Sequence, residues 1–124
     1  EDNLYNWLDG VYITSPFFNN NTASIKLADG SCIGLNNNSE TNYAKHIFID
    51  INGSQTKPNI AGKDLFFFYV NEQGFIKPFG DTWEQTELTN PSKNNACNQQ
   101  AKLGGFTCAA RIMSEGWEIN YWNN

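Results

Sequence analysis

The feature that most constrains the fold is a series of short alternating segments between residues 24 and 77, separated by turn-forming residues. Segments 24–27 and 31–35 alternate polar and apolar side chains, and the Asp29-Gly30 pair between them is typical of a two-residue hairpin. Further strands are predicted at 46–51, 64–70 and 75–77, each next to an Asn-Gly or Asn-rich turn or a proline. The sequence therefore predicts an antiparallel β-meander of four to five strands.

The amino-terminal segment, residues 1–9, has a different spacing of apolar residues. Leu4, Trp7 and Leu8 are three and four positions apart, as on one side of a helix, and Gly10 would end that helix. This pattern predicts a short helix, or the end of a longer one.

A second helix is predicted over 107–115, near the carboxyl end. Thr107 would cap its first turn, and Ala109, Ile112 and Met113 would form its buried side. The preceding stretch, 84–100, is polar and is predicted to be irregular. The fold class is therefore α+β, with short helices beside a sheet.

Chain length and charge limit the possible functions. A chain of 124 residues, 40% of them hydrophobic, fits one domain spanning 1–124. The net charge is -5 and the eight Lys and Arg residues are scattered, so no nucleic-acid partner is expected and attachment to an anionic membrane surface is disfavoured.

The three cysteines, Cys32, Cys97 and Cys108, cannot all pair within one chain. Cys97 and Cys108 bracket a polar, Gly-containing stretch, and a bridge between them would indicate an oxidising compartment. The alternative is three buried free thiols in a cytosolic protein. Zinc is disfavoured, because the chain has no Cys-x-x-Cys pair and its one histidine, His46, is remote in sequence from the cysteine pair.

Known catalytic patterns are missing from the sequence. His46 is the only histidine available as a base, and it lies in the apolar segment KHIFID, where an ordinary strand residue is expected. No Gly-rich phosphate loop, His-Glu-x-x-His helix or paired-carboxylate motif is found. The prediction is that the chain is not an enzyme, with a small hydrolase as the least favoured hypothesis.

One local pattern could bind calcium. Asp50 and Asn52 place side-chain oxygens two residues apart, as calcium loops do, and Asp64 could complete the site. The closing bidentate Glu of an EF-hand is absent, since Ala61 takes its place, and a plain Asx-type turn after a strand is the better explanation of the pattern. No cofactor is predicted, and calcium is kept as a hypothesis.

Aromatic residues are the other candidates for binding. Residues 66–68 are all Phe and lie in one predicted strand, so at least one must be covered by another element or face a partner. Near the carboxyl end, Trp117, Tyr121 and Trp122 form either a sugar-stacking or subunit-contact surface, or part of the core.

Two stretches resemble the heads of bacterial type IV pilin-like and pseudopilin-like proteins. They are FIDINGSQTKPNIAGKDLFFFYV, residues 48–70, and CNQQAKLGGFTCAARIMSEGWEINY, residues 97–121. In that family a strand ending in Asp-x-Asn-Gly leads through Pro-Asn and Gly-Lys-Asp to an aromatic strand, and a Cys-bounded tail closes the domain.

The resemblance implies a pilin-like head, normally preceded by a long hydrophobic helix that anchors the subunit in the inner membrane and packs inside a filament. Residues 1–9 would be the last turns of that helix, lying across the sheet. It also implies a Cys97–Cys108 disulfide, pilin or pseudopilin subunits as partners, a possible surface glycan or secreted cargo, and an extracytoplasmic location. The alternative function is a secreted carbohydrate-binding or adhesive module.

Overall fold

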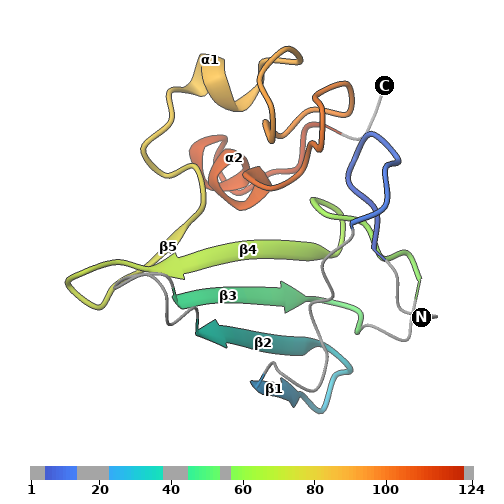
Figure 1. Ribbon diagram of the computed structural model, residues 1–124, viewed down its shortest axis with the longest axis vertical. Helices are drawn as coiled ribbons and strands as arrows, with labels where there is room; N and C mark the ends of the chain where they lie inside the picture. The colour runs from blue at the N-terminus through green and yellow to red at the C-terminus, as the bar shows by residue number, and fades with distance from the viewer. Residues whose placement is uncertain (1–4, 14–22, 38–44, 54–56, 122–124) are drawn as a thin grey trace.

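The computed structural model describes residues 5–13, 23–37, 45–53 and 57–121. Five strands form one antiparallel sheet in the order β1-β2-β3-β4-β5, as Figure 1 shows. The predicted meander is therefore confirmed, with strand ends that differ by one or two residues. The strands are β1 (Ala23–Lys26), β2 (Cys32–Asn37), β3 (Lys45–Asp50), β4 (Leu65–Val70) and β5 (Ile76–Pro78).

The register of the strands assigns the side chains to two sides of the sheet. Phe48 of β3 is paired with Gly34 of β2 and with Phe67 of β4, and both phenylalanines are buried. Their sequence neighbours point to the opposite side, because side chains alternate along a strand. We call the side that carries Phe48 and Phe67 the core side.

Aromatic side chains from distant parts of the chain cover the core side. Trp7 stacks on Phe67 with ring centroids 5.9 Å apart, and Phe106 lies 4.9 Å from the same ring. Phe79, which follows β5, packs 4.4 Å from Phe106. The main hydrophobic core is therefore built between the sheet, the amino-terminal segment and the carboxyl-terminal part.

The helix predicted at residues 1–9 is wrong for the residues that the structure describes, 5–9. Asn6 forms an antiparallel bridge with Tyr12 and a parallel bridge with Ile60. A turn follows Trp7, in which the Gly10 amide donates to the Trp7 carbonyl at 3.0 Å. The segment is an irregular loop because its main chain bonds to residues distant in sequence, and Leu4 lies outside the described residues.

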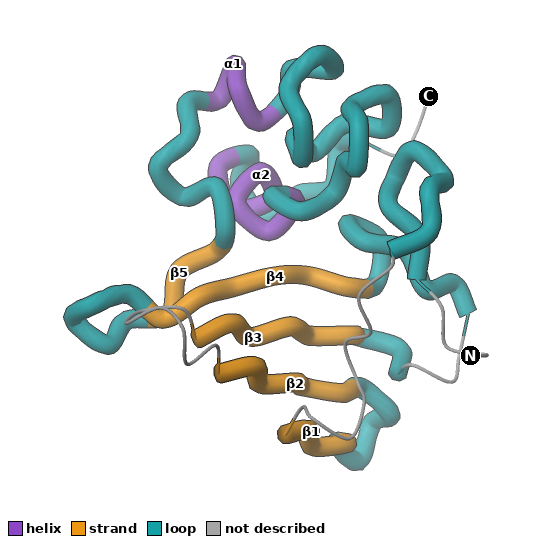
Figure 2. The backbone as a smooth tube through the Cα atoms, in the orientation of Figure 1, coloured by secondary structure: helices purple, strands orange, loops and turns teal. Residues whose placement is uncertain are grey.

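The carboxyl-terminal part, residues 79–121, lies above β4 and contains two short helices, α1 (Gln85–Leu88) and α2 (Cys108–Ser114). Figure 2 shows that most of this part is loop. The α1 turn was not predicted, although Glu84 and Glu87 form a capping box around its start. No helix among the described residues has the length and apolar character needed to cross a bilayer.

Helix α2 confirms the predicted carboxyl-terminal helix with different details. Thr107 is the residue before the helix, but its hydroxyl donates to the carbonyl of Asn95 at 2.9 Å rather than capping the first turn. Ala109 is buried and Ile112 is half-buried, while Met113 is 40% exposed and so does not belong to the core.

Candidate functional site

The side of the sheet opposite the core is apolar and largely uncovered. We call this surface the apolar sheet face and define it by six residues whose side chains are between 40% and 72% exposed. Their exposure contrasts with the burial of Phe48 and Phe67 on the core side. The six residues are Ile25, Leu35, Ile51, Ile76, Met113 and Trp117.

Two shallow hollows lie side by side on this face. The first, about 330 Å³, runs over β1 to β5 and is lined by Ile25, Leu35 and neighbouring residues. The second, about 310 Å³, lies toward α2 and includes Met113 and Trp117. Both hollows share Ile49, Phe68 and Ile76, and none of their lining residues is charged. They therefore form one continuous apolar groove across the sheet.

The alternation that builds this face was visible in the sequence but was not interpreted as a site. Isoleucine occupies positions 47 and 49 of β3 and position 51, directly after the strand. His46 and Phe48, which alternate with them, point to the core side. The same alternation along β4 decides where the three consecutive phenylalanines, residues 66–68, lie. Phe67 is in the core, Phe66 packs against the disulfide region, and Phe68 lines the groove.

The predicted aromatic surface is not one platform. Trp117 is 72% exposed beside α2, whereas Tyr121 is 7% exposed and its hydroxyl donates to the Gly62 carbonyl at 2.6 Å. The guanidinium of Arg111 lies over the Tyr121 ring, 5.3 Å from its centre. Tyr121 is therefore part of the core, and Trp117 belongs to the apolar sheet face. Trp122 lies outside the described residues.

A buried pair of carboxyl groups lies where β3 ends and β4 begins. Asp50 and Asp64 are 0% and 2% exposed. The Tyr5 hydroxyl donates to Asp50 Oδ2, and the Asn52 amide donates to Asp50 Oδ1 at 3.1 Å. The amide of Ile60 donates to Asp64 Oδ1 at 2.7 Å. The pair thus joins the amino-terminal segment, the sheet and the loop before β4.

Burial, together with a smaller contribution from the neighbouring Asp50 carboxylate, raises the pKa of Asp64 to about 7, against the opposing effect of the hydrogen bond from the Ile60 amide. Burial also raises the pKa of Asp50, while its hydrogen bond from Tyr5 acts in the opposite direction. The two carboxyl groups also interact with each other, and this interaction raises the pKa of Asp64 while it lowers that of Asp50.

Of the three residues proposed for calcium, Asp50 interacts with Asp64 and accepts a hydrogen bond from the main-chain amide of Asn52. Asp50 and Asp64 are adjacent, whereas the side chain of Asn52 donates to the Pro58 carbonyl at 3.3 Å. The ranges that the structure describes contain no group of three or more His, Cys, Asp or Glu side chains able to hold a metal ion. Calcium binding by Asp50, Asn52 and Asp64 therefore stays a prediction.

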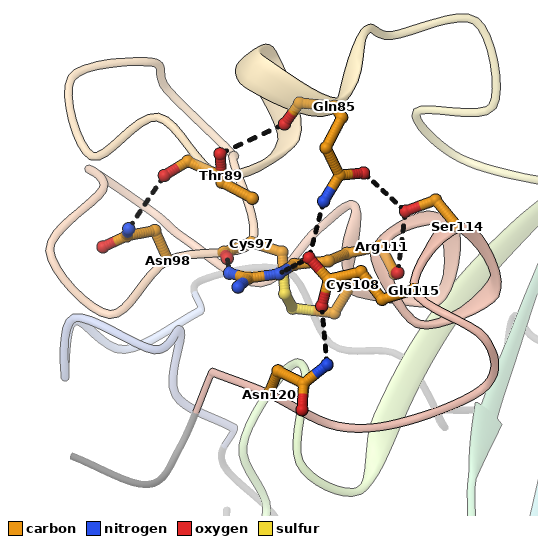
Figure 3. A network of polar contacts seen from close by, with 9 residues as sticks. All are labelled: Gln85, Thr89, Cys97, Asn98, Cys108, Arg111, Ser114, Glu115 and Asn120. Atoms are coloured by element: carbon orange, nitrogen blue, oxygen red, sulfur yellow. Dashed lines mark hydrogen bonds and ion pairs between the residues drawn. A yellow bond between two sulfur atoms is a disulfide. The ribbon is translucent and has the colours of Figure 1, made fainter.

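The Cys97–Cys108 disulfide is present, and its Sγ atoms are 2.05 Å apart. Arg111 on α2 donates to the Cys97 carbonyl at 2.7 Å and pairs with Glu115 at 3.0 Å. Figure 3 shows that Gln85 reaches the same Glu115 carboxylate from α1. The disulfide and this polar network hold the two helices of the carboxyl-terminal part together.

His46 and Cys32, the remaining candidates, lie on the core side of the sheet. The His46 ring meets the Phe79 ring edge-on, 5.1 Å between centroids, and burial lowers the pKa of its imidazole. Cys32 is a half-buried free thiol, paired across the strands with Asp50. His46 therefore contributes to packing, as the sequence indicated.

Comparison with known proteins identifies a family but gives no function. No curated protein and no solved structure matches the chain. A family model described as a family of unknown function, DUF6613, matches residues 11–121, which include all five strands and both helices. The chain therefore belongs to the DUF6613 family.

Proposed function

We propose that this chain is a structural subunit that acts by assembly, as the head of a type IV pilin-like or pseudopilin-like filament protein. The observation that carries the proposal is the apolar sheet face. Monomeric proteins seldom leave apolar patches larger than a few hundred Å² in water, and larger ones usually mark surfaces that bind another polypeptide or a membrane. The uncharged groove fits a surface that is buried on assembly.

Three further features support the filament assignment. The two sequence stretches that resemble pilin-like heads occur in the family's order, at residues 48–70 and 97–121. The meander is followed by a carboxyl-terminal part closed by the Cys97–Cys108 disulfide. An oxidising, extracytoplasmic location accounts for that disulfide. The partners proposed are other pilin-like subunits, with a surface glycan or secreted cargo contacting the outer loops.

The test is to locate the native protein and read its amino terminus. Immunogold labelling of producing cells should mark surface or envelope filaments, and deletion of the gene should remove the label. The gene should encode a short basic leader ending in Gly, followed by an apolar helix of about 20 residues. A freely secreted product released by an ordinary signal peptidase would overturn the filament assignment.

A secreted carbohydrate-binding or adhesive module is the second candidate, and the exposure of Trp117 favours it. An indole that is 72% exposed is available to stack on a sugar ring. Binding on a glycan array that is lost in Trp117→Ala, while the variant keeps the wild-type melting temperature, would support this function. Absence of binding to every glycan on the array would rule out this function.

A further inference from the structure

We infer that two copies of this chain pack against each other through their apolar sheet faces, as a two-fold symmetric sheet-on-sheet dimer. This inference rests on the proposed function as an assembling subunit and names the partner of the same surface. It is argued from area, charge and the position of the covering segments.

The exposed area matches what a stable dimer needs. With roughly 200 Å² for each large apolar side chain, the six residues of the face expose on the order of 700 Å² per copy. Two copies would bury about 1,400 Å², within the ~1,200 to 2,000 Å² of stable interfaces. Because peripheral atoms are also covered, this area represents the centre of the contact.

Charge favours a copy of the same chain. A two-fold contact places equivalent groups near each other, so a charged face would repel itself. The residues lining the groove carry no charge, and Ser24 is the only one of them with a polar side chain. Rows of Ile and Phe side chains from two sheets can interdigitate about 10 Å apart, as in β-sandwiches.

The described chain does not cover this face itself. The amino-terminal segment, residues 5–13, packs on the core side through Tyr5 and Trp7. Helix α2 reaches only the β4 end of the face, where Ile112 packs near Phe66. Farther from α2, Ile25 on β1 and Leu35 on β2 remain 60% and 48% exposed.

Symmetry predicts which residues meet. The two hollows share Ile49, Phe68 and Ile76, and we place the two-fold axis at Ile49 and Phe68, nearest the middle of the sheet, and parallel to the strands. Rotation about that axis lays β1 of one copy over β5 and α2 of the other. Trp117 would then enter the hollow beside Ile25 and Leu35 of the other copy. An exposed tryptophan at such a contact is a typical hot spot.

The experiment measures mass by light scattering and sedimentation on oxidised residues 1–124, from low micromolar to submillimolar concentration. Wild type should shift from the 14.0 kDa monomer to a dimer of twice that mass. Leu35→Lys should weaken the dimer at least tenfold, because the symmetric contact buries two unpaired charges. Val11→Lys is the matched control: Val11 is 49% exposed and Leu35 48%, but Val11 lies in the amino-terminal segment.

Trp117→Ala provides a second variant at an exposed position after α2, in case Leu35→Lys fails to fold. It should also weaken the dimer at least tenfold, with an unchanged circular dichroism spectrum. A wild-type monomer at every concentration, or a dimer that neither folded variant weakens, would overturn the inference. Neither result bears on filament labelling in cells, so failure of the dimer is separable from failure of the proposed function.

Discussion

Replacing Asp64 by asparagine should remove the fall in folding stability that this carboxyl group causes between about pH 4 and about pH 7. The pKa of Asp64 is raised to about 7 in the folded protein, mainly by burial. An unfolded aspartate titrates near pH ~3.9. Between these values the folded state holds a proton that the unfolded state has lost, so stability is greatest below the unfolded pKa and falls as pH rises through the folded pKa.

The size of the effect follows from this difference. Each pH unit between the two pKa values lowers the free energy of unfolding by at most about 1.4 kcal/mol. Over the roughly three units involved this is at most about 4 kcal/mol. The side-chain oxygen of the asparagine can still accept the hydrogen bond from the Ile60 amide, and its side-chain NH2 group can donate one to Asp50. The variant should therefore fold, and its stability should lack the pH dependence that Asp64 contributes.

Urea unfolding followed by tryptophan fluorescence, repeated across this pH range, measures the slope directly. Asp29→Asn is the matched control, because the Ser31 amide lowers the pKa of Asp29 and moves its titration below the range. That control should keep the wild-type slope, whatever its overall stability. An Asp64→Asn curve that falls with pH as steeply as the wild-type curve would refute the reasoning.

Three further outcomes are expected. Replacing Cys97 and Cys108 together by alanine should lower the free energy of unfolding by about 2 to 3 kcal/mol, measured by urea unfolding, since the bridge closes a loop of 11 residues. Gly53→Ala should cost more than about 2 kcal/mol and Gly74→Ala about 1 kcal/mol, because both have positive φ but an added Cβ at Gly53 would lie 2.4 Å from a carbonyl oxygen. Equal costs would contradict this account. In an NMR titration the His46 imidazole should show a pKa below its ordinary value, because burial disfavours the charged ring.

The meander could be predicted from the sequence because its signals are local. Strand alternation and the Asp29-Gly30 turn act within a few residues, and each strand pairs with the next along the chain. The amino-terminal helix was predicted wrongly because the deciding contacts are distant. The spacing of Trp7 and Leu8 fits a helix, but Asn6 bonds to Ile60 across the fold.

The same limit applies to the candidate sites. Asp50 and Asp64 were selected from the sequence as oxygen ligands, but nothing local shows that the Tyr5 hydroxyl, 45 residues before Asp50, meets them. The Phe66–Phe68 run indicated that both sides of the sheet are apolar. Which side of the sheet remains uncovered depends on where Trp7 and the carboxyl-terminal part pack. The alternation of apolar residues along the strands does not show which side they will cover.

The contacts of the amino-terminal segment have a consequence for the order of folding. The sheet has only neighbour-to-neighbour pairing, so its hairpins can form in sequence while the polypeptide is still being synthesised. The Leu8 amide, however, donates to the Gly104 carbonyl, and the Leu103 amide donates to the Asp9 carboxylate. These bonds cannot form until the last fifth of the chain exists. Leu8 and Asp9, although synthesised before the sheet, are therefore among the last of the described residues to reach their native positions.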